Sequence, residues 1–348
     1  MNITIKEIAK LADVSRGTVD RVIHGRPGVK PDIRKKVLAI LKDFNYQPNL
    51  AGKALVQSRR NIKIGVVLSP DFNPFVEEMK KGIADEAEKI SAFGVELDIE
   101  VIRAFDSSEQ LAVLETLCEK DVSAIAIVPV DDESIRIRIN EIVGGGIPVV
   151  TFNSDLPGSR RLCFVGQDNF RAGRTQGALA HILLREISEP KIAIITSTLH
   201  LACHKERVDG FQKKLSECTN FQVVACEENF DMDDVAFTLT SKYLETFPDL
   251  SLIYLTGGGI AGVARALERK NTGKFVRVLC HDLIPESRQL LYTDRIDAVI
   301  GQDPYNQGCL PIRILFDYLF MAKKPTNECI YTNIEIFTSE NTSSLNLV

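Results

Sequence analysis

Long apolar runs, an export signal and paired cysteines are all missing from this 348-residue sequence. No apolar run approaches the roughly 18 residues of a membrane span. The first residues hold neither an apolar segment nor a small-residue cleavage site. The eight cysteines are scattered, with no C-x-x-C pair, which is typical of reduced thiols. The sequence therefore predicts a soluble, cytoplasmic protein without a membrane partner.

Common catalytic motifs are missing as well. The sequence contains no G-x-x-x-x-G-K-[ST], no G-x-S-x-G and no H-E-x-x-H. His200, Cys203, His204 and Glu206 have passable metal-ligand spacing, but a loop of neutral histidines beside Arg207 favours an ordinary structural role. We expect no catalytic residue, no metal and no cofactor.

Charge divides the chain into two parts. Residues 1–60 carry 13 Lys and Arg against 5 Asp and Glu, a net charge of +8, whereas the remaining residues carry a net charge of −13. A basic head on an acidic body indicates that the head meets a polyanion while the body stays clear of it. Nucleic acid is the leading candidate.

Residues 1–48 have the pattern of three short helices. Thr4 and Glu7 predict a capping box at the first helix. Ser15 is a candidate cap for the second helix, and Pro31 fits the first turn of the third. The third helix has a predicted apolar face of Ile33, Val37, Ile40, Leu41 and Phe44. Two helices joined by a tight turn predict a helix-turn-helix. The alternative is a basic helical subdomain whose charges only face solvent.

The segments TIKEIA from Thr4, VSRGTVDRVI from Val14 and NYQPN from Asn45 resemble the DNA-binding head of LacI/GalR-type transcriptional regulators. The resemblance implies that the recognition helix reads bases with Arg16, Gly17 and Arg21. The other positions implied to contact DNA in the head are Thr4, Ser15, Thr18, His24 and Val29.

Three residues depart from the family pattern in this head. Gly17 supplies no side chain at a reading position, and His24 replaces the usual Asn. Asp20 replaces the usual Ser, and its negative charge is expected to weaken or redirect DNA binding unless Arg16 or Arg21 neutralises it.

Residues 49–61 predict a hinge between head and body. The segment is short and basic, and Gly52 costs about 1 kcal/mol relative to Ala in a helix. The resemblance implies that the hinge folds only on DNA, where Leu55 wedges into the minor groove. A plain interdomain linker is the alternative.

From residue 62 to residue 337 buried strands alternate with amphipathic helices. Strands are predicted at 62–68, 95–102, 123–128, 148–152, 192–196, 221–226, 252–256, 276–280 and 298–301. Repeated strand, helix, strand units over this length predict doubly wound α/β architecture in two units. Residues 338–348 are expected to form a loosely tied polar tail.

Polar and aromatic side chains follow several of these strands. Ligands of doubly wound folds bind beyond the carboxyl ends of the strands. Carboxylates, amides and an arginine can pair with hydroxyl groups, while phenylalanine covers the apolar side of a sugar ring. The pattern predicts a sugar or polyol pocket.

The body resembles the ribose-binding-type periplasmic sugar-binding fold, which the same regulators attach to their DNA-binding head. The implied fold is a three-helix helix-turn-helix domain and hinge, followed by a two-lobed, type I periplasmic-binding-protein-like α/β domain. Gly257 replaces an Asn of ribose-binding relatives and Ser154 replaces an Arg, which argues against ribose itself. The implied effector contacts are Phe72, Asn73, Phe75, Asn153, Asp155, Asp168, Arg207, Phe230, Asp282 and Gln302.

The segment from Gly257 to Gly262 supports a competing interpretation. It fits G-x-G-x-x-G, follows a predicted strand and precedes Asp282 by ~20 residues. An NAD-dependent oxidoreductase is therefore an alternative, although the first strand-to-helix turn lacks this fingerprint and a turn with positive φ explains the glycines better. An exported sugar-binding transport receptor is a third possibility, disfavoured by the basic head and the missing export signal.

These patterns together predict a ligand-responsive transcriptional regulator of the repressor type. It is expected to sense a monosaccharide, polyol or sugar derivative. It is expected to bind a pseudo-palindromic operator in double-stranded DNA as a homodimer.

Overall fold

The computed structural model describes residues 3–23, 26–44, 62–70, 74–218, 220–270 and 276–342. Within these ranges no helix is long and apolar enough to cross a membrane. The predictions for His24, for the hinge with Leu55, and for Phe72 and Asn73 lie outside the described residues.

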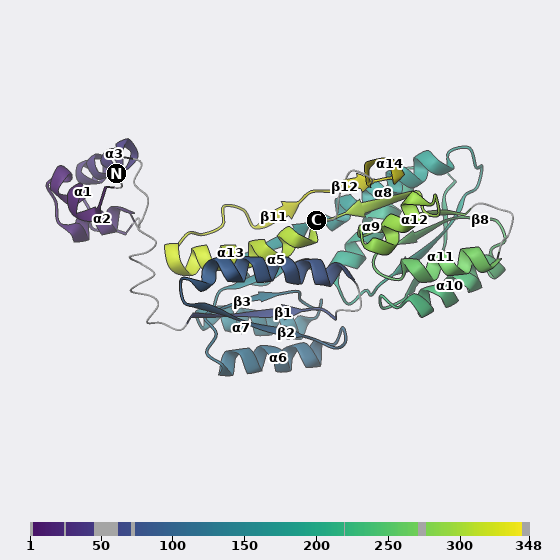
Figure 1. The fold of residues 1–348 in the computed structure, drawn as a ribbon, viewed down its shortest axis with the longest axis horizontal. Helices are drawn as coiled ribbons and strands as arrows, with labels where there is room; N and C mark the ends of the chain where they lie inside the picture. The colour runs from purple at the N-terminus through teal and green to yellow at the C-terminus, as the bar shows by residue number, and fades with distance from the viewer. Residues whose placement is uncertain are drawn as a thin grey trace.

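The head consists of α1 (Ile5–Ala12), α2 (Arg16–Ile23) and α3 (Pro31–Asp43), drawn in purple in Figure 1. The predicted capping box is confirmed, because the Glu7 backbone N–H donates to Thr4 Oγ1 and the Thr4 N–H donates to Glu7 Oε2. The Thr18 N–H donates to Ser15 Oγ over 3.1 Å, so Ser15 caps α2 as predicted. Local capping chemistry therefore sets where these helices begin.

A small apolar core holds the three helices together. Ile8, Val19 and Val37 supply one fully buried side chain from each helix. Phe44 was predicted on the buried face of the third helix, and this is wrong: its side chain is 53% exposed. The reason is that α3 ends at Asp43 and Phe44 is its C-cap residue, so the helical face does not extend to it.

The first lobe is a six-stranded sheet covered by helices on both faces. Its strand order is β11-β5-β4-β3-β1-β2, with every neighbouring pair parallel. Helices α5 and α13 cover one face and α6 and α7 the other. The elements are β1 (Ile62–Leu68), α5 (Pro74–Ser91), β2 (Val95–Val101), α6 (Ser107–Glu119), β3 (Ala124–Ile127), α7 (Glu133–Gly144), β4 (Val149–Phe152), β5 (Cys163–Gln167), α13 (Pro304–Met321) and β11 (Cys329–Thr332).

Strand β1 shows why this sheet needs helices on both sides. Successive strand residues point to opposite faces, so Ile64, Val66 and Leu68 pack toward α5 and α13, while Val67 packs toward α6 and α7. A parallel strand buried on both faces is a near-continuous apolar run. This is the signal that located the strand in the sequence.

The second lobe repeats this architecture. Its strand order is β12-β10-β9-β8-β6-β7, parallel except for β12, which runs antiparallel to β10. Helices α8 and α9 pack on one face and α10, α11 and α12 on the other. The elements are α8 (Asn169–Leu184), β6 (Lys191–Thr196), α9 (Ala202–Leu215), β7 (Gln222–Glu228), α10 (Asp233–Thr246), β8 (Leu250–Leu255), α11 (Ile260–Lys270), β9 (Arg277–His281), α12 (Pro285–Tyr292), β10 (Ala298–Gly301), β12 (Glu335–Phe337) and α14 (Ser339–Thr342).

The chain passes between the lobes after β5, after β10 and between β11 and β12 (Figure 1). Gln167, the last residue of β5 and the start of the first connection, holds these passages together. Its Nε2 donates to the carbonyl of Gly301 over 2.9 Å and to the carbonyl of Asn333 over 3.0 Å. One buried amide therefore ties all three connections at the junction of the lobes.

Every strand predicted from the sequence overlaps an observed strand, and the doubly wound architecture is confirmed. Strand β5 was not predicted although it is buried, because its short apolar run ends in Gly166 and Gln167. Strands β11 and β12 were not predicted, because their side chains are half-buried or exposed and short runs of this kind resemble loops. The predicted loose tail instead begins with α14, whose Thr342 is 3% exposed.

Candidate functional site

The outer surface of α2 carries the predicted base-reading residues. Arg16, Gly17 and Arg21 are exposed, as are Thr4 and Ser15, while Thr18 and Val29 are half-buried. A β-carbon added at Gly17 would meet only Ser15 Oγ, at 3.7 Å. Packing within the head therefore does not require glycine at this position.

Asp20 is paired, but not with either arginine named in the sequence-based expectation. Its Oδ2 lies 3.3 Å from Nη1 of Arg26, in the loop after α2. Arg34 Nη2 donates to the carbonyl of Arg26 over 2.6 Å and positions that loop. Because Arg26 takes the carboxylate, Arg16 and Arg21 are not required to neutralise it.

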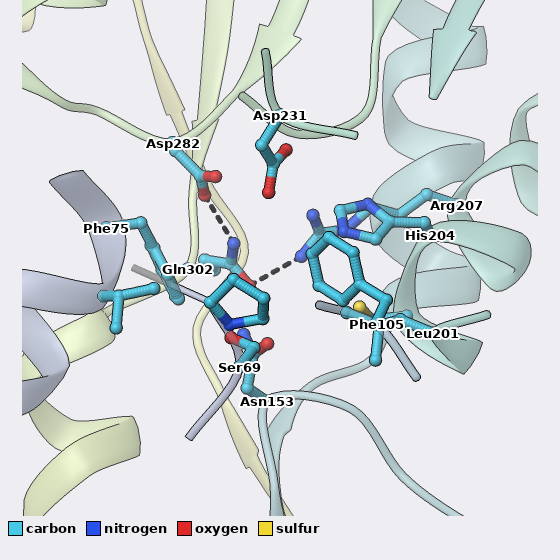
Figure 2. Close-up of a pocket in the computed structure, with 13 residues that line it drawn as sticks. Ser69, Phe75, Phe105, Asn153, Leu201, His204, Arg207, Asp231, Asp282 and Gln302 are labelled. Atoms are coloured by element: carbon cyan, nitrogen blue, oxygen red, sulfur yellow. Dashed lines mark hydrogen bonds between the residues drawn. The ribbon is translucent and has the colours of Figure 1, made fainter. Parts of the chain in front are cut away.

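A cavity lies between the two lobes, at the carboxyl ends of strands from both sheets. Figure 2 shows side chains from both lobes converging on it. Its volume is about 30 Å³. The lining residues are Ser69, Pro70, Phe75, Val76, Phe105, Asn153, Leu201, Cys203, His204, Arg207, Asp231, Asp282 and Gln302.

Arg207 organises the polar wall of this cavity. The residue lies on α9, is 1% exposed, and donates through Nε to Asn169 Oδ1 over 3.0 Å. Its Nη1 donates to the Thr256 carbonyl over 2.8 Å and its Nη2 to Gln302 Oε1 over 2.6 Å. Gln302 Nε2 in turn donates to Asp282 Oδ1 (Figure 2). This chain fixes four polar groups in one orientation, which is the requirement for selective binding of a polyol.

Two carboxylates and a neutral imidazole face the same space. Burial and the nearby Asp282 charge raise the pKa of Asp231 from 3.8 to about 6, against the lowering effects of the Gly258 N–H, Ser197 and Arg207. Burial and the Arg207 charge lower the pKa of His204 to about 3. His204 is therefore uncharged at neutral pH, and its Nδ1 lies 3.2 Å from Thr256 Oγ1.

Several predicted contacts come together in the cavity and others do not. Phe75, Asn153, Arg207, Asp282 and Gln302 all line it. The lining does not include Asp155, Asp168 or Phe230.

The two carboxylates outside the lining make other contacts, and Phe230 is partly exposed to solvent. Asp155 accepts hydrogen bonds from Arg161 Nε over 2.5 Å and from Arg161 Nη2 over 2.6 Å. Asp168 caps α8, where its Oδ1 accepts from the Arg171 N–H. Phe230 is 40% exposed. The residues that follow each strand therefore lie at the edge of the sheet where the cavity is found. Asp155 and Asp168 do not line the cavity, because Arg161 pairs with Asp155 and Asp168 caps α8.

The sequence reasoning missed Asp231, His204 and Phe105 as lining residues. Asp231 directly follows Phe230, a predicted contact, and His204 lies one turn before Arg207 on α9. Helical spacing from Arg207 was thus a usable signal for His204. In the described part of the chain no group of three or more His, Cys, Asp or Glu side chains could hold a metal ion.

The glycines at 257–262 have structural reasons. The Gly258 N–H donates to Asp231 Oδ1 over 2.6 Å, so a carboxylate of the chain itself occupies the anion position of this turn. Gly259 has a φ of 103°, and a β-carbon there would lie 2.2 Å from Asn229 Nδ2. A β-carbon at Gly262 would lie 1.9 Å from the Asp233 carbonyl oxygen.

Replacing Gly262 with alanine is expected to destabilise the second lobe by about 1–3 kcal/mol, because the backbone of α10 must move away from α11. Gly144→Ala is the matched control, since its β-carbon would meet only Arg160 Nη1, at 3.7 Å. Urea unfolding of both variants measures the difference. Equal stability of the two variants would contradict the close approach of the helices.

Glu206, on α9 beside Arg207, is a further titratable group near the cavity. Burial and the charges of Asp155 and Asp168 raise its pKa from 4.5 to about 7. The folded protein therefore holds this proton more tightly than the unfolded chain does.

A raised carboxyl pKa makes the free energy of unfolding fall as pH rises from about 4.5 to about 7. Glu206→Gln is expected to remove roughly 1–3 kcal/mol of this decline. Urea unfolding between pH 5 and pH 8 tests this, with Glu119→Gln on the exposed end of α6 as control. A decline that is the same in wild type and Glu206→Gln would show that Glu206 does not contribute to it.

Comparisons with known proteins match both parts of the chain. Residues 4–49 match the family described as bacterial regulatory proteins, lacI family. Residues 64–324 match the family described as periplasmic binding protein domain.

Individual relatives include transcriptional regulators and a sugar-binding protein. Catabolite control protein A of Priestia megaterium is 28% identical over 220 residues, which cover 62% of this chain and 62% of that protein, less than two thirds of its length. The HTH-type transcriptional regulator MalR of Streptococcus pneumoniae serotype 4 is 28% identical over 313 residues, covering 87% of this chain and 90% of that protein. The crystal structure of GanP, a glucose-galactose binding protein from Geobacillus stearothermophilus, matches with a TM-score of 0.72 and 27% identity, covering 82% of this chain and 99% of that one.

Proposed function

Because this chain belongs to the lacI family of bacterial regulatory proteins and carries a periplasmic binding protein domain behind its lacI domain, we propose that it is a ligand-responsive transcriptional regulator. The head binds operator DNA, and the cavity between the lobes binds a monosaccharide, polyol or sugar derivative. Two copies bind a pseudo-palindromic operator in the cytoplasm, each inserting α2 into a major groove.

One observation carries this proposal: a single chain joins a helix with exposed Arg16 and Arg21 to a two-lobed cavity lined by Arg207, Asp282 and Gln302. The helix presents cations to a polyanion, and the cavity presents paired donors and acceptors to hydroxyl groups. A transport receptor has no use for the first feature. The glycine turn gives little support to a dinucleotide enzyme, because Asp231 accepts the Gly258 N–H that a pyrophosphate would need.

Movement of the lobes links the two functions. The cavity is lined by side chains of both lobes, so a bound monosaccharide contacts both lobes at once. The connections held by Gln167 restrict the relative motion of the lobes to a hinge motion at the lobe junction. A ligand that favours one arrangement of the lobes shifts the population of head geometries, typically with about 1–3 kcal/mol of coupling.

Operator affinity is expected to fall at least about 1,000-fold between 0.05 and 0.2 M salt, because binding releases counterions from neutralised phosphates. The DNA for this measurement is selected by the purified protein from a random-sequence duplex pool. Fluorescence anisotropy over a salt series gives the slope. A flat salt profile, or failure to enrich any duplex, would count against the proposed function.

A further inference from the structure

The Asp231 side chain occupies the space beside Gly257. A β-carbon added at Gly257 would lie 2.8 Å from Asp231 Oδ1 and 2.8 Å from His204 Cε1, closer than real β-carbons approach such atoms. Position 257 therefore has no room for a side chain while Asp231 and His204 stay where they are. The loop between β7 and α10 supplies the polar group at this point of the cavity wall (Figure 2).

The backbone at this loop is held in an unfavourable conformation. Phe230 and Asp231 have φ angles of 52° and 59°, in the left-handed region. Glycine adopts this conformation without steric cost, whereas other residues do so at a cost that surrounding structure must offset. Aspartate is one of the residues that adopt this conformation most readily, so the backbone permits Asp231, and the contacts of its side chain show what it does there.

One contact of Asp231 has a structural role, and the same side chain can also contact a ligand. Its Oδ1 accepts the backbone N–H of Gly258 over 2.6 Å and so braces the turn before α11. That contact needs only an acceptor oxygen and not a negative charge. Figure 2 shows the carboxylate directed into the cavity, on the same side as Asp282.

The charges around the cavity are unbalanced. Asp231 and Asp282 both line it, and among the described lining residues Arg207 is the cation. Arg207 donates to the neutral oxygens of Asn169, Thr256 and Gln302, and Gln302 stands between it and Asp282. A ligand that brings another negative charge meets two carboxylates in a water-poor space, where repulsion is weakly screened.

We propose that Asp231 determines the charge of the effector: the site takes a polyol without negative charge, whose hydroxyl or ammonium group donates to Asp231, and rejects the corresponding acid. This inference rests on the proposed function and specifies its ligand. It assigns Asp231 to ligand selection in addition to its contact with the turn.

Matched ligands test this assignment on the full-length protein. The probes are D-glucose, D-glucosamine and D-glucuronate, and D-galactose, D-galactosamine and D-galacturonate, measured by calorimetry. Wild type is expected to bind at least one neutral or amino sugar and to bind its acid about 100-fold more weakly. Asp231→Asn keeps an acceptor for the Gly258 N–H, so it is expected to retain the wild-type Tm while the preference falls about tenfold. Asp209→Asn, which changes an exposed carboxylate on α9 outside the lining, is expected to keep the full preference.

The possible failures are distinct. An acid that binds wild type as tightly as its neutral counterpart overturns the inference and leaves the sugar sensor standing. The inference is also overturned if a folded Asp231→Asn protein keeps the wild-type preference for the neutral or amino sugar over its acid. Asp231 would then only stabilise the turn at Gly258. If Asp231→Asn does not fold, the ratio of the wild-type affinities for the neutral or amino sugar and for its acid alone tests the inference. If wild type binds none of the six probes, both the proposed effector class and this inference fail.

Discussion

Arg207→Ala is expected to weaken effector binding by about 100-fold while operator affinity stays within about twofold of wild type. The expected loss is large because Arg207 holds Asn169, the Thr256 carbonyl and Gln302 at once, and Gln302 in turn holds Asp282. Removing the guanidinium leaves these groups without their common donor. The head lies in another domain and does not depend on this network.

The measurement pairs calorimetry of effector binding with anisotropy of operator binding on the same preparation. Arg174→Ala is the matched control: Arg174 lies on α8 and pairs with Glu217 outside the cavity lining. Its effector affinity is expected to stay near the wild-type value. If Arg207→Ala is folded by circular dichroism but loses both functions together, the division of labour between head and body is refuted.

Arg21→Ala is expected to have the opposite result, lowering operator affinity by about 10- to 100-fold with effector binding unchanged. An arginine that pairs with a base contributes about 1–3 kcal/mol of discrimination, and Arg21 is exposed on α2 with no role in the core of the head. The variant is expected to relax the preference at one base-pair position rather than weaken all duplexes equally. Binding to a set of single-base operator variants tests this.

Arg185→Ala provides the charge-matched control, because Arg185 is an exposed arginine of the body at the end of α8. It is expected to keep wild-type operator affinity. Equal losses in Arg21→Ala and Arg185→Ala would indicate that overall charge, and not the α2 surface, governs DNA binding. A uniform loss across all single-base variants in Arg21→Ala would reassign Arg21 to phosphate contact.

Short-range chemistry explains which features could be predicted from the sequence. The capping box of Thr4 and Glu7, the cap at Ser15 and Pro31 at the start of α3 involve residues at most three positions apart. Most buried strands were identifiable because both of their faces are apolar, whereas β5, which ends in Gly166 and Gln167, was missed. The exposure of Phe44 was misjudged because α3 ends one residue before it. The pairing of Asp20 with Arg26 was missed because it depends on how the loop after α2 folds back.

The sequence by itself determined the basic head, the alternating strands and helices, and the edges of the sheets where the cavity lies, because these follow from local capping, periodicity and charge. Only the tertiary structure decided which polar residues share the cavity. Asp155 accepts a hydrogen bond from Arg161, and Asp168 caps the start of α8, so neither lines the cavity. Asp231 entered the cavity because Gly257, 26 positions further along the chain, leaves space for it. Such choices depend on which groups meet in space and on the cost of leaving a buried charge unpaired, and neither is encoded in local sequence.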